Sequence, residues 1–502
     1  MDAKAIAPLR ARLQEIADLD AVDSVLTWDQ SVCMPPGGGE ARGRQLATVA
    51  RLRHERWHDP RLARDLEAAE GAQGADGDPM TAALLRVVRR DLERALRVPP
   101  DWVARFAAHG ATAYDAWVEA RATGRVERVQ QLLEKTLEYS HAYAGFFPGY
   151  DHPADVLIDE ADEGATVANL RPLFARLRSV LVPWVAEWTS EPDPLPRGPY
   201  PREAQLAAGL ELAQAIGYDL QRGRQDESPH PFAVRFGHGD VRITTRIVPE
   251  DLTEGLFSTL HEAGHAMYEQ GVDPAFEGTP LAEGASAGVH ESQARLWENQ
   301  VGRSSAFWAF ALPRLQRHFP ALDGVTVERA YRAVNRVVPS LIRTEADEVT
   351  YNLHVILRFD LELDLLDGRL SVAELPEAWA ERYAADLGVR PRGHADGWLQ
   401  DVHWFGGLVG GSFQGYTLGN VMSAQFLAAA RRALGDLDGA FAAGDFGPLR
   451  AWLTEHVYRH GRAKPVEQLV RDATGDPLSV EPYLAYLHGK YEALANAPVG
   501  GI

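Results

Sequence analysis

Residues 249–271 read PEDLTEGLFSTLHEAGHAMYEQG and contain the motif His-Glu-Ala-Gly-His at positions 261–265. A single helix is predicted over residues 249–270, because a proline and acidic residues precede an apolar stripe of helical spacing and a glycine follows it. On that helix His261 and His265 share one face with side chains about 5–6 Å apart, a separation that one tetrahedral Zn²⁺ can bridge. The stretch therefore predicts a helix that carries two metal ligands.

Glu262 follows the first histidine and is expected to project beside the ion. There its carboxylate can take a proton from a water molecule, as a general base does. Chance alone would place roughly 0.05 copies of the motif in a chain with 17 histidines. The alternative interpretation is that both histidines are hydrogen-bonded core residues of a buried helix.

A third metal ligand is expected after this helix. Residues 271–288 are rich in glycine, proline and small side chains, and helical character returns at His290-Glu291-Ser292. The interval allows a turn and an antiparallel return helix, so that Glu291 can complete a site whose fourth position stays open for water, as in catalytic zinc centres. Three other residues compete for this role from the same region: Glu283, His290 and Glu298. His290 is expected to point elsewhere, towards substrate or towards a ligand.

The composition excludes several classes of partner. The chain has 51 Lys plus Arg against 71 Asp plus Glu, a formal net charge of −20, which argues against nucleic acid and anionic membranes as partners. A single cysteine, Cys33, cannot form an intramolecular disulfide. The N-terminal segment has no apolar core of signal-peptide type, and no stretch reaches the ~18 apolar residues of a membrane span. We therefore expect a cytoplasmic protein.

Most of the chain has helical periodicity, so the expected fold is mainly α. Scaffold helices are predicted for residues 4–150, with breaks at 33–39 and in a polar loop at 71–78, and again for 421–495.

The period changes just before the His261 helix. Residues 231–236 and 241–247 flank a glycine-containing turn, and residues 241–247 alternate in the manner of a strand, which predicts a β-hairpin. An edge strand at this place could pair with an extended peptide. The alternative is a small hairpin with a purely structural role.

Residues 340–367 are predicted to form one long helix. Polar side chains recur on it at spacings of three or four, at Arg343, Asp347, Tyr351, His354 and Arg358. This stripe is either a solvated face or the wall of a cleft. In the cleft interpretation Asp347 or Glu348 would support a metal histidine and Arg343 would anchor a carboxylate.

A glycine-rich segment, residues 405–420, follows further along the chain. Phe413 and Tyr416 among its glycines indicate a flexible segment that carries aromatic and hydrogen-bonding groups. The segment lacks the phosphate-binding pattern G-x-x-x-x-G-K-[ST].

These residues resemble the M32 family of metallocarboxypeptidases, of the carboxypeptidase Taq type. Trp28-Asp29 followed by Met34-Pro35 is similar to the opening segment of that family. Five family signatures occur in order: D-x-R-x-T at 240–244, H-E-x-x-H at 261–265, H-E-S at 290–292, I-R-x-x-A-D at 342–347 and G-x-x-Q-D-x-H-W at 397–404.

The resemblance implies a large helical metallopeptidase of gluzincin type that forms one domain over residues 1–502. Two helical lobes would surround a deep central groove, with the small β-hairpin beside the zinc helix. The zinc site would lie in residues 240–300 and the segments that line the substrate groove in residues 340–420.

The resemblance also implies a function and a set of site residues. One Zn²⁺, or Co²⁺, would be bound per chain of a homodimer. Peptides with a free C-terminal carboxylate would lose single residues, with broad tolerance of the side chain and poor action at proline. Glu291 would be the third ligand beside His261 and His265, Glu262 the base, and His403 or Tyr416 the donor to the oxyanion. The expected substrate-binding residues are Arg343, Arg242, Asp240, Thr244, Gln400 and Asp401.

Two other functions remain open on the sequence. An endopeptidase or a dipeptidyl carboxypeptidase of related fold would carry the same zinc motif, which does not set the position of cleavage. A helical binding scaffold could hold the metal for structural reasons alone. The open coordination position and Glu262 argue against the scaffold.

Overall fold

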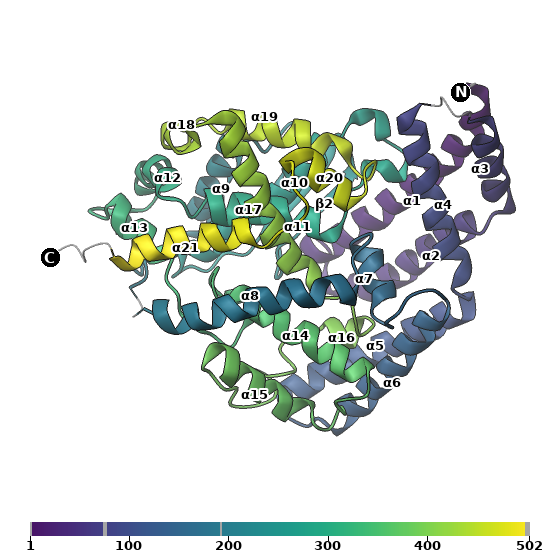
Figure 1. Cartoon of the computed structure of the whole chain (residues 1–502), viewed down its shortest axis with the longest axis horizontal. Helices are drawn as coiled ribbons and strands as arrows, with labels where there is room; N and C mark the ends of the chain where they lie inside the picture. Colours follow the sequence, from purple (N-terminus) through teal and green to yellow (C-terminus); the bar gives the residue numbers. More distant parts are fainter. Residues whose placement is uncertain (1–2, 74–77, 191–192, 497–502) are drawn as a thin grey trace. The chain divides into compact units, whose positions relative to one another are not determined.

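The structure is a computed structural model that describes residues 3–73, 78–190 and 193–496. It confirms a mainly helical chain with one small sheet (Figure 1). The chain divides into two compact units that alternate along the sequence. The first comprises Met1–Leu96, Pro194–Val334 and Phe426–Pro477, and the second comprises Arg97–Asp193, Asn335–Gln425 and Leu478–Ile502.

The first unit is built around the helix that carries the histidine motif, α10. This helix packs against its neighbours α9 and α11 and against the sheet. The helices of the unit are α1 (Ala3–Val32), α2 (Gly39–Trp57), α3 (Pro60–Ala72), α4 (Pro79–Arg97), α9 (Arg202–Ile216), α10 (Leu252–Gly271), α11 (Ala287–Arg295), α12 (Ser305–His318), α13 (Val327–Val334), α18 (Leu437–Ala443), α19 (Gly447–His456) and α20 (Val466–Thr474).

The breaks predicted near the N-terminus fall between helices. A 3₁₀ turn, Pro36–Gly38, separates α1 from α2. Of the predicted loop at 71–78, residues 74–77 lie outside the described residues. None of the helices within 3–73, 78–190 and 193–496 combines the length and the apolar character that crossing a bilayer requires.

The sheet has three strands: β1 (Gln225–Glu227), β2 (Ala233–Gly237) and β3 (Asp240–Thr245). The predicted hairpin is confirmed, since β2 pairs antiparallel with β3 and places Ala233 opposite Ile243. The short strand β1 pairs with β3 in parallel, which makes β3 the central strand. The edge strands of the sheet are therefore β1 and β2, and the pairing of such an edge with an extended peptide stays a prediction.

The helix α10 begins slightly later than predicted. The Asp251 side chain accepts a hydrogen bond from the backbone N–H of Thr253 at 2.8 Å and caps the helix, so Pro249 and Glu250 precede it.

A glycine within the motif decides how closely α10 meets α11. A Cβ atom at Gly264 would lie 2.7 Å from the Cα atom of Ala294, so the two helix backbones touch there.

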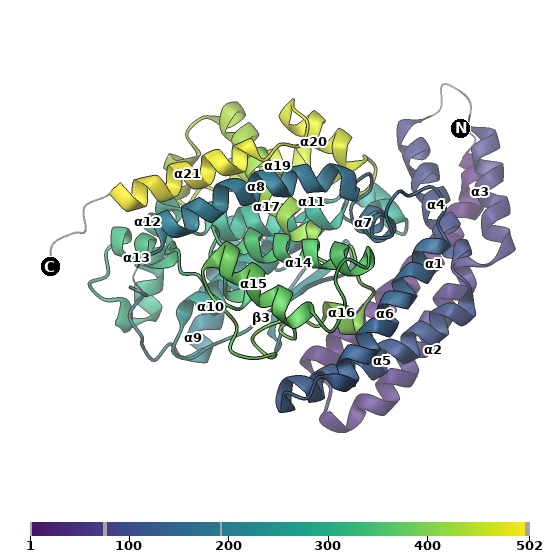
Figure 2. The ribbon, with the colours of Figure 1, turned by 60° about the horizontal axis from the view of Figure 1, so that its bottom comes forward.

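The second unit has α14 at its centre. This helix contacts α8 and α15, and Figure 2 shows these helices side by side. The helices of the unit are α5 (Pro100–Thr123), α6 (Glu127–Gly145), α7 (Asp155–Ala161), α8 (Val167–Trp188), α14 (Tyr351–Leu366), α15 (Leu375–Leu387), α16 (His403–Gly406) and α21 (Glu481–Asn496). The helix α17 (Gln414–Leu434) begins in this unit and ends in the first.

The prediction of one long helix over 340–367 is wrong for its first third, which is not α-helical. A 3₁₀ turn, Arg343–Glu345, comes first, and α14 begins only at Tyr351. The Asp347 carboxylate accepts hydrogen bonds from the backbone N–H groups of Val349 at 2.9 Å and Thr350 at 3.1 Å, which ends the irregular segment and starts the helix. Apolar periodicity alone did not reveal this local cap.

Candidate metal and active site

Three side chains of the first unit converge as the ligands of one metal ion would. Among the described residues, the ligand atoms of His261, His265 and Glu291 all lie within 4.8 Å of one another. The Nε2 atoms of His261 and His265 are 3.7 Å and 3.5 Å from the same oxygen, Oε2 of Glu291. In a tetrahedral site with bonds of about 2.1 Å the ligand atoms are about 3.4 Å apart. The arrangement therefore fits a divalent ion.

Both histidines are held through their other ring nitrogen. Nδ1 of His261 is 2.9 Å from Oε2 of Glu298, and Nδ1 of His265 is 2.6 Å from Nδ1 of His290. These contacts leave both Nε2 atoms facing Glu291. Glu298 and His290, two of the expected competitors for the third ligand, thus bind the ligands themselves. The third competitor, Glu283, pairs with Arg462 at 3.0 Å.

The support for a metal histidine expected from Asp347 or Glu348 comes instead from Glu298. Asp347 caps α14, and Glu348 accepts a hydrogen bond from Tyr486 at 2.8 Å and pairs with Lys490. Glu298 lies in a π-helical stretch, Leu296–Val301, that continues α11. The only sequence signal for its role is its spacing of about two helical turns from Glu291.

Arginines of the same segment fix the carboxylates. Nε of Arg295 donates to Oε1 of Glu291 at 2.6 Å, which turns the other oxygen towards the histidines. Arg295 and Arg303 both contact Glu298, at 3.3 Å and 3.2 Å. Burial raises the pKa of Glu298, but these arginines and His261 outweigh it and lower that pKa to about 2. The carboxylate is therefore ionised and able to accept from His261.

The site is electrostatically prepared for a cation. Burial would lower the pKa of His261, yet the Glu291 and Glu298 carboxylates outweigh it and raise this pKa to about 9. Burial lowers the pKa of His265 to about 3, so this ring is neutral, as a metal ligand must be. The carboxylates of Glu291, Glu298 and Glu262 all raise the pKa of His261 and so attract positive charge to the site.

Glu262 has the properties of a general base. Its side chain is buried, with a residue exposure of 6%, and this burial raises its pKa to about 7. The His261 cation opposes the rise, and the other two glutamates reinforce it. A carboxyl group that titrates near neutrality can both take and return a proton during catalysis.

The expected residues of the D-x-R-x-T signature lie on β3. Arg242 pairs with Asp240 at 2.8 Å, and its guanidinium lies over the rings of Trp28 and Phe236, 4.5 Å and 4.7 Å from their centroids. Thr244 is fully buried, and its hydroxyl accepts from the Phe232 backbone N–H at 2.9 Å. Thr244 therefore holds the adjoining loop in place.

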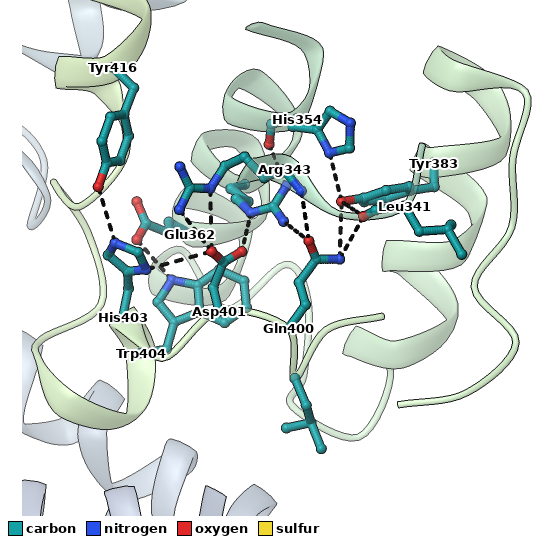
Figure 3. Close-up of polar contacts among 12 residues, drawn as sticks. Leu341, Arg343, His354, Glu362, Tyr383, Gln400, Asp401, His403, Trp404 and Tyr416 are labelled. Carbon is teal, nitrogen blue, oxygen red and sulfur yellow. Dashed lines mark hydrogen bonds and ion pairs between the residues drawn. The ribbon is translucent and has the colours of Figure 1, made fainter. Parts of the chain in front are cut away.

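The second unit contains a buried cluster of arginines around Asp401 (Figure 3). Nη2 of Arg343 lies 3.0 Å from Oδ1 of Asp401, and Nε of Arg358 lies 2.6 Å from Oδ2. Nη2 of Arg358 also donates to Gln400 at 2.7 Å. Arg358 and His354 are both 0% exposed, so the solvated-face interpretation of the polar stripe is wrong. Two guanidinium cations share one carboxylate in this cluster.

His403 and Tyr416 lie beside the arginine cluster. The Tyr416 hydroxyl and Nε2 of His403 are 3.4 Å apart, and the Arg343 guanidinium lies 4.8 Å from the centre of the Tyr416 ring (Figure 3). The second unit therefore brings together five of the expected site residues: Arg343, Gln400, Asp401, His403 and Tyr416.

A buried glutamate in contact with Trp404, Glu362, was not among the residues predicted from the sequence. Glu362, on α14, is fully buried and accepts a hydrogen bond from Nε1 of Trp404 at 2.8 Å (Figure 3). Backbone N–H groups of Gly410 and Ser412 also lower its pKa, but burial dominates and raises it to about 7. The sequence signal for its burial is its position in a helix that consists mostly of apolar residues.

Comparison with known proteins gives concordant matches along the chain. A model of the family described as "Carboxypeptidase Taq (M32) metallopeptidase" matches residues 8–491. The chain is 43% identical to "Thermostable carboxypeptidase 1" of Thermus thermophilus, over 96% of this chain and 97% of that protein. It is 34% identical to "Carboxypeptidase 1" of Bacillus subtilis, over 96% and 97% of the two chains.

Solved structures give the same result. The M32 carboxypeptidase from Deinococcus radiodurans R1 is 49% identical and superimposes with a TM-score of 0.95, covering 98% of this chain and 100% of that one. The carboxypeptidase of Pyrococcus furiosus is 33% identical with a TM-score of 0.94, covering 98% and 99% of the two chains.

Proposed function

This chain belongs to the carboxypeptidase Taq (M32) metallopeptidase family and is a metallocarboxypeptidase, and from that premise we propose that it releases single residues from the free C-terminus of peptides. One observation carries the proposal for the reacting site. Two imidazole nitrogens and one Glu291 oxygen stand at the spacing of metal ligands, next to a carboxyl group with a near-neutral pKa. Broad tolerance of the released residue is part of the proposal.

The donor set fits Zn²⁺, and Co²⁺ accepts the same nitrogen and oxygen ligands. We propose one such ion per chain, held by His261, His265 and Glu291. When bound, a divalent ion there supplies a Lewis acid, which lowers the pKa of water and polarises a carbonyl group.

Glu262 performs the proton transfers in the proposed reaction. Its carboxylate takes a proton from water as the water oxygen attacks the carbonyl carbon of the last peptide bond. It then gives that proton to the leaving nitrogen as the C–N bond breaks. The carboxyl group is neutral in between and returns to its starting state, so it acts catalytically.

Removal of C-terminal residues also requires a group that recognises the free carboxylate, and we assign this to Arg343. The Arg343 and Arg358 guanidiniums share the single Asp401 carboxylate, so one positive charge remains for an incoming anion. Gln400 and Asp401 hold the two arginines in place. His403 and Tyr416 carry donors next to Arg343 and are the proposed partners of the developing oxyanion.

The composition of the products tests the proposed function. A defined peptide is digested with the metal-loaded protein and the products are weighed over time. Successive losses of one residue from the C-terminus support the proposal. Release of dipeptides, or of internal fragments, would instead support the dipeptidyl carboxypeptidase or endopeptidase alternatives. A protein that binds metal and cleaves nothing would support the binding scaffold.

Homodimerisation and a cytoplasmic location remain predictions from the family resemblance and the sequence. Sedimentation velocity over a range of protein concentrations tests the dimer. A mass of one chain at all concentrations would contradict it.

A further inference from the structure

The two metal histidines are supported in different ways. His261 meets the Glu298 carboxylate directly, with 2.9 Å between Nδ1 and Oε2. His265 instead meets a second imidazole, with 2.6 Å between its Nδ1 and Nδ1 of His290. Nε2 of His290 then lies 2.7 Å from Oε1 of Glu269. A row of three side chains therefore begins at a proposed ligand and ends at a carboxylate.

Only one set of proton positions satisfies this row. To offer a lone pair to a metal, His265 must be unprotonated at Nε2, so its proton sits on Nδ1 and is donated to His290. Nδ1 of His290 is then an acceptor, and the proton of this neutral ring sits on Nε2. There it is donated to the carboxylate oxygen of Glu269. With the proton of His290 on Nδ1 instead, its Nε2 would be an acceptor facing the carboxylate of Glu269, which is also an acceptor.

We propose that Glu269 is a positioning residue for the metal, which acts through His290 to fix the tautomer and the ring orientation of His265. The proposal rests on the metal site assigned above and deepens it. Glu269 lies one helical turn beyond His265 on the same helix, α10. Its carboxylate reaches His265 through the ring of His290, which belongs to α11. The H-E-S signature thus contributes both a ligand, Glu291, and the middle member of this relay.

Neighbouring residues confine His290 and Glu269. Gly284 packs against His290, and a Cβ atom at position 284 would lie 2.7 Å from Cδ2 of the ring. The ring centroid of Tyr268 lies 5.2 Å from that of the imidazole. Arg235, on β2, places Nε 3.8 Å from Oε2 of Glu269 and also pairs with Glu277. The Arg235 cation therefore lies beside the Glu269 carboxylate on the side away from His290.

Metal affinity measures the relay without reference to turnover. Apo protein is titrated with Co²⁺ in competition with a chromophoric chelator, and the unfolding temperature of each apo variant is recorded. Glu269→Gln and His290→Phe should each weaken Co²⁺ binding about 10- to 100-fold, the usual effect of losing a partner behind a metal histidine. Glu298→Gln, behind His261, is the positive control. Glu277→Gln, which alters the far side of Arg235, is the matched control and should leave the affinity within about twofold of wild type.

Two further variants separate a relay from a simple electrostatic effect. Glu269→Asp keeps the charge but withdraws the carboxylate by one methylene group, so the relay predicts a loss similar to that of Glu269→Gln. The double variant Glu269→Gln/His290→Phe should bind Co²⁺ no more weakly than His290→Phe alone, because both changes interrupt one path.

Several results would overturn the relay. They are a Glu269→Asp protein with wild-type affinity, additive losses in the double variant, or unchanged affinity in Glu269→Gln while Glu298→Gln is weakened. Each of these leaves the metal site and the proposed activity intact. Unchanged Co²⁺ affinity in both Glu298→Gln and His265→Ala would instead remove the metal from this site, and the proposed function with it.

Discussion

Gly264 of α10 meets Ala294 of α11 backbone to backbone, with room for a hydrogen atom and none for a methyl group. A Cβ atom at position 264 would lie 2.7 Å from Cα of Ala294 and 2.7 Å from the carbonyl oxygen of Gln293. Both are backbone atoms, which cannot swing aside as the tip of a side chain can. The distance between the helix of His261 and His265 and the helix of Glu291 is therefore set by a glycine inside the metal motif.

Gly264→Ala should destabilise the protein and weaken its metal site. Overpacking of this kind costs about 1–3 kcal/mol, which exceeds the gain of about 1 kcal/mol from replacing glycine by alanine within a helix. We expect a lower unfolding temperature and a Co²⁺ affinity reduced at least tenfold, because the shift separates Glu291 from the histidines. Gly43→Ala, on α2 where no atom lies within 4 Å of the added methyl group, is the control and should not destabilise. Unchanged Co²⁺ affinity in Gly264→Ala would show that helix spacing does not determine the site.

Glu262→Gln should abolish most activity while metal binding persists. The amide has nearly the shape of the carboxylate but cannot accept a proton, so kcat should fall about 10²- to 10⁴-fold, the usual contribution of a general base. Metal content after dialysis and kcat on one peptide are measured together. Glu254→Gln, two helical turns earlier on α10 and paired with Arg246, is the control and should retain activity. A Glu262→Gln protein that retains metal and normal turnover would refute the base assignment.

The parts of the site that were predictable depend on local geometry. Helical spacing puts His261 and His265 on one face whatever surrounds them, and strand alternation revealed the hairpin. Glu298 and Glu269 were not assigned, because their contacts depend on how α10 meets α11, which is a matter of packing. The strand β1 was missed because it has three residues and pairs in parallel with a strand that follows it by more than ten residues.

Periodicity alone left two interpretations open for the polar residues of 340–367, and only the solvated face is contradicted. Periodicity treats a charged residue as a candidate for the surface, yet Arg358 and Glu362 are completely buried. Each is tolerated in the core because of its partners: Asp401 and Gln400 for the arginine, Trp404 for the glutamate. These partners lie some 40 residues further along the chain, beyond the reach of any local pattern.

Arg343→Ala should discriminate between peptides according to their C-terminal group. We expect about a 100-fold loss of kcat/KM on peptides with a free carboxylate, the size of one or two charge-assisted hydrogen bonds. On C-terminally amidated peptides that are cleaved at all, the loss should be small. The fold should survive because Asp401 keeps its contact with Arg358.

The matched control is Arg390→Ala, an exposed arginine of the same unit that pairs with Glu377 at 3.5 Å. It should behave as wild type on both kinds of peptide. Equal losses on free and amidated peptides in Arg343→Ala would contradict carboxylate recognition by this residue.

Glu362→Gln should change the pH dependence of stability. The unfolded chain ionises this carboxyl near pH 4.5, whereas burial raises the pKa in the folded protein to about 7. Between these values the folded state retains a proton that the unfolded state has released, so the wild type loses stability as the pH rises, by up to about 3 kcal/mol. Glutamine does not titrate. The free energy of unfolding of the variant relative to wild type should therefore increase from pH 4.5 to 7 and stay level above it, whatever constant offset the lost hydrogen bonds add.

Urea unfolding at pH 5, 6, 7 and 8 measures this difference, and further measurements at pH 3 and 4 cover the control. Glu374 provides a control of opposite sign, because its carboxylate accepts hydrogen bonds from the Ser371 hydroxyl and backbone N–H, and these lower its pKa. Its stabilising effect is present above the pKa of the unfolded chain and is lost as the pH falls, so Glu374→Gln should cost more stability at pH 7 than at low pH. A relative stability of Glu362→Gln that stays flat or declines between pH 5 and 7 would mean that this buried carboxyl is already ionised, held by Trp404 and the glycine-rich segment as a permanent anion.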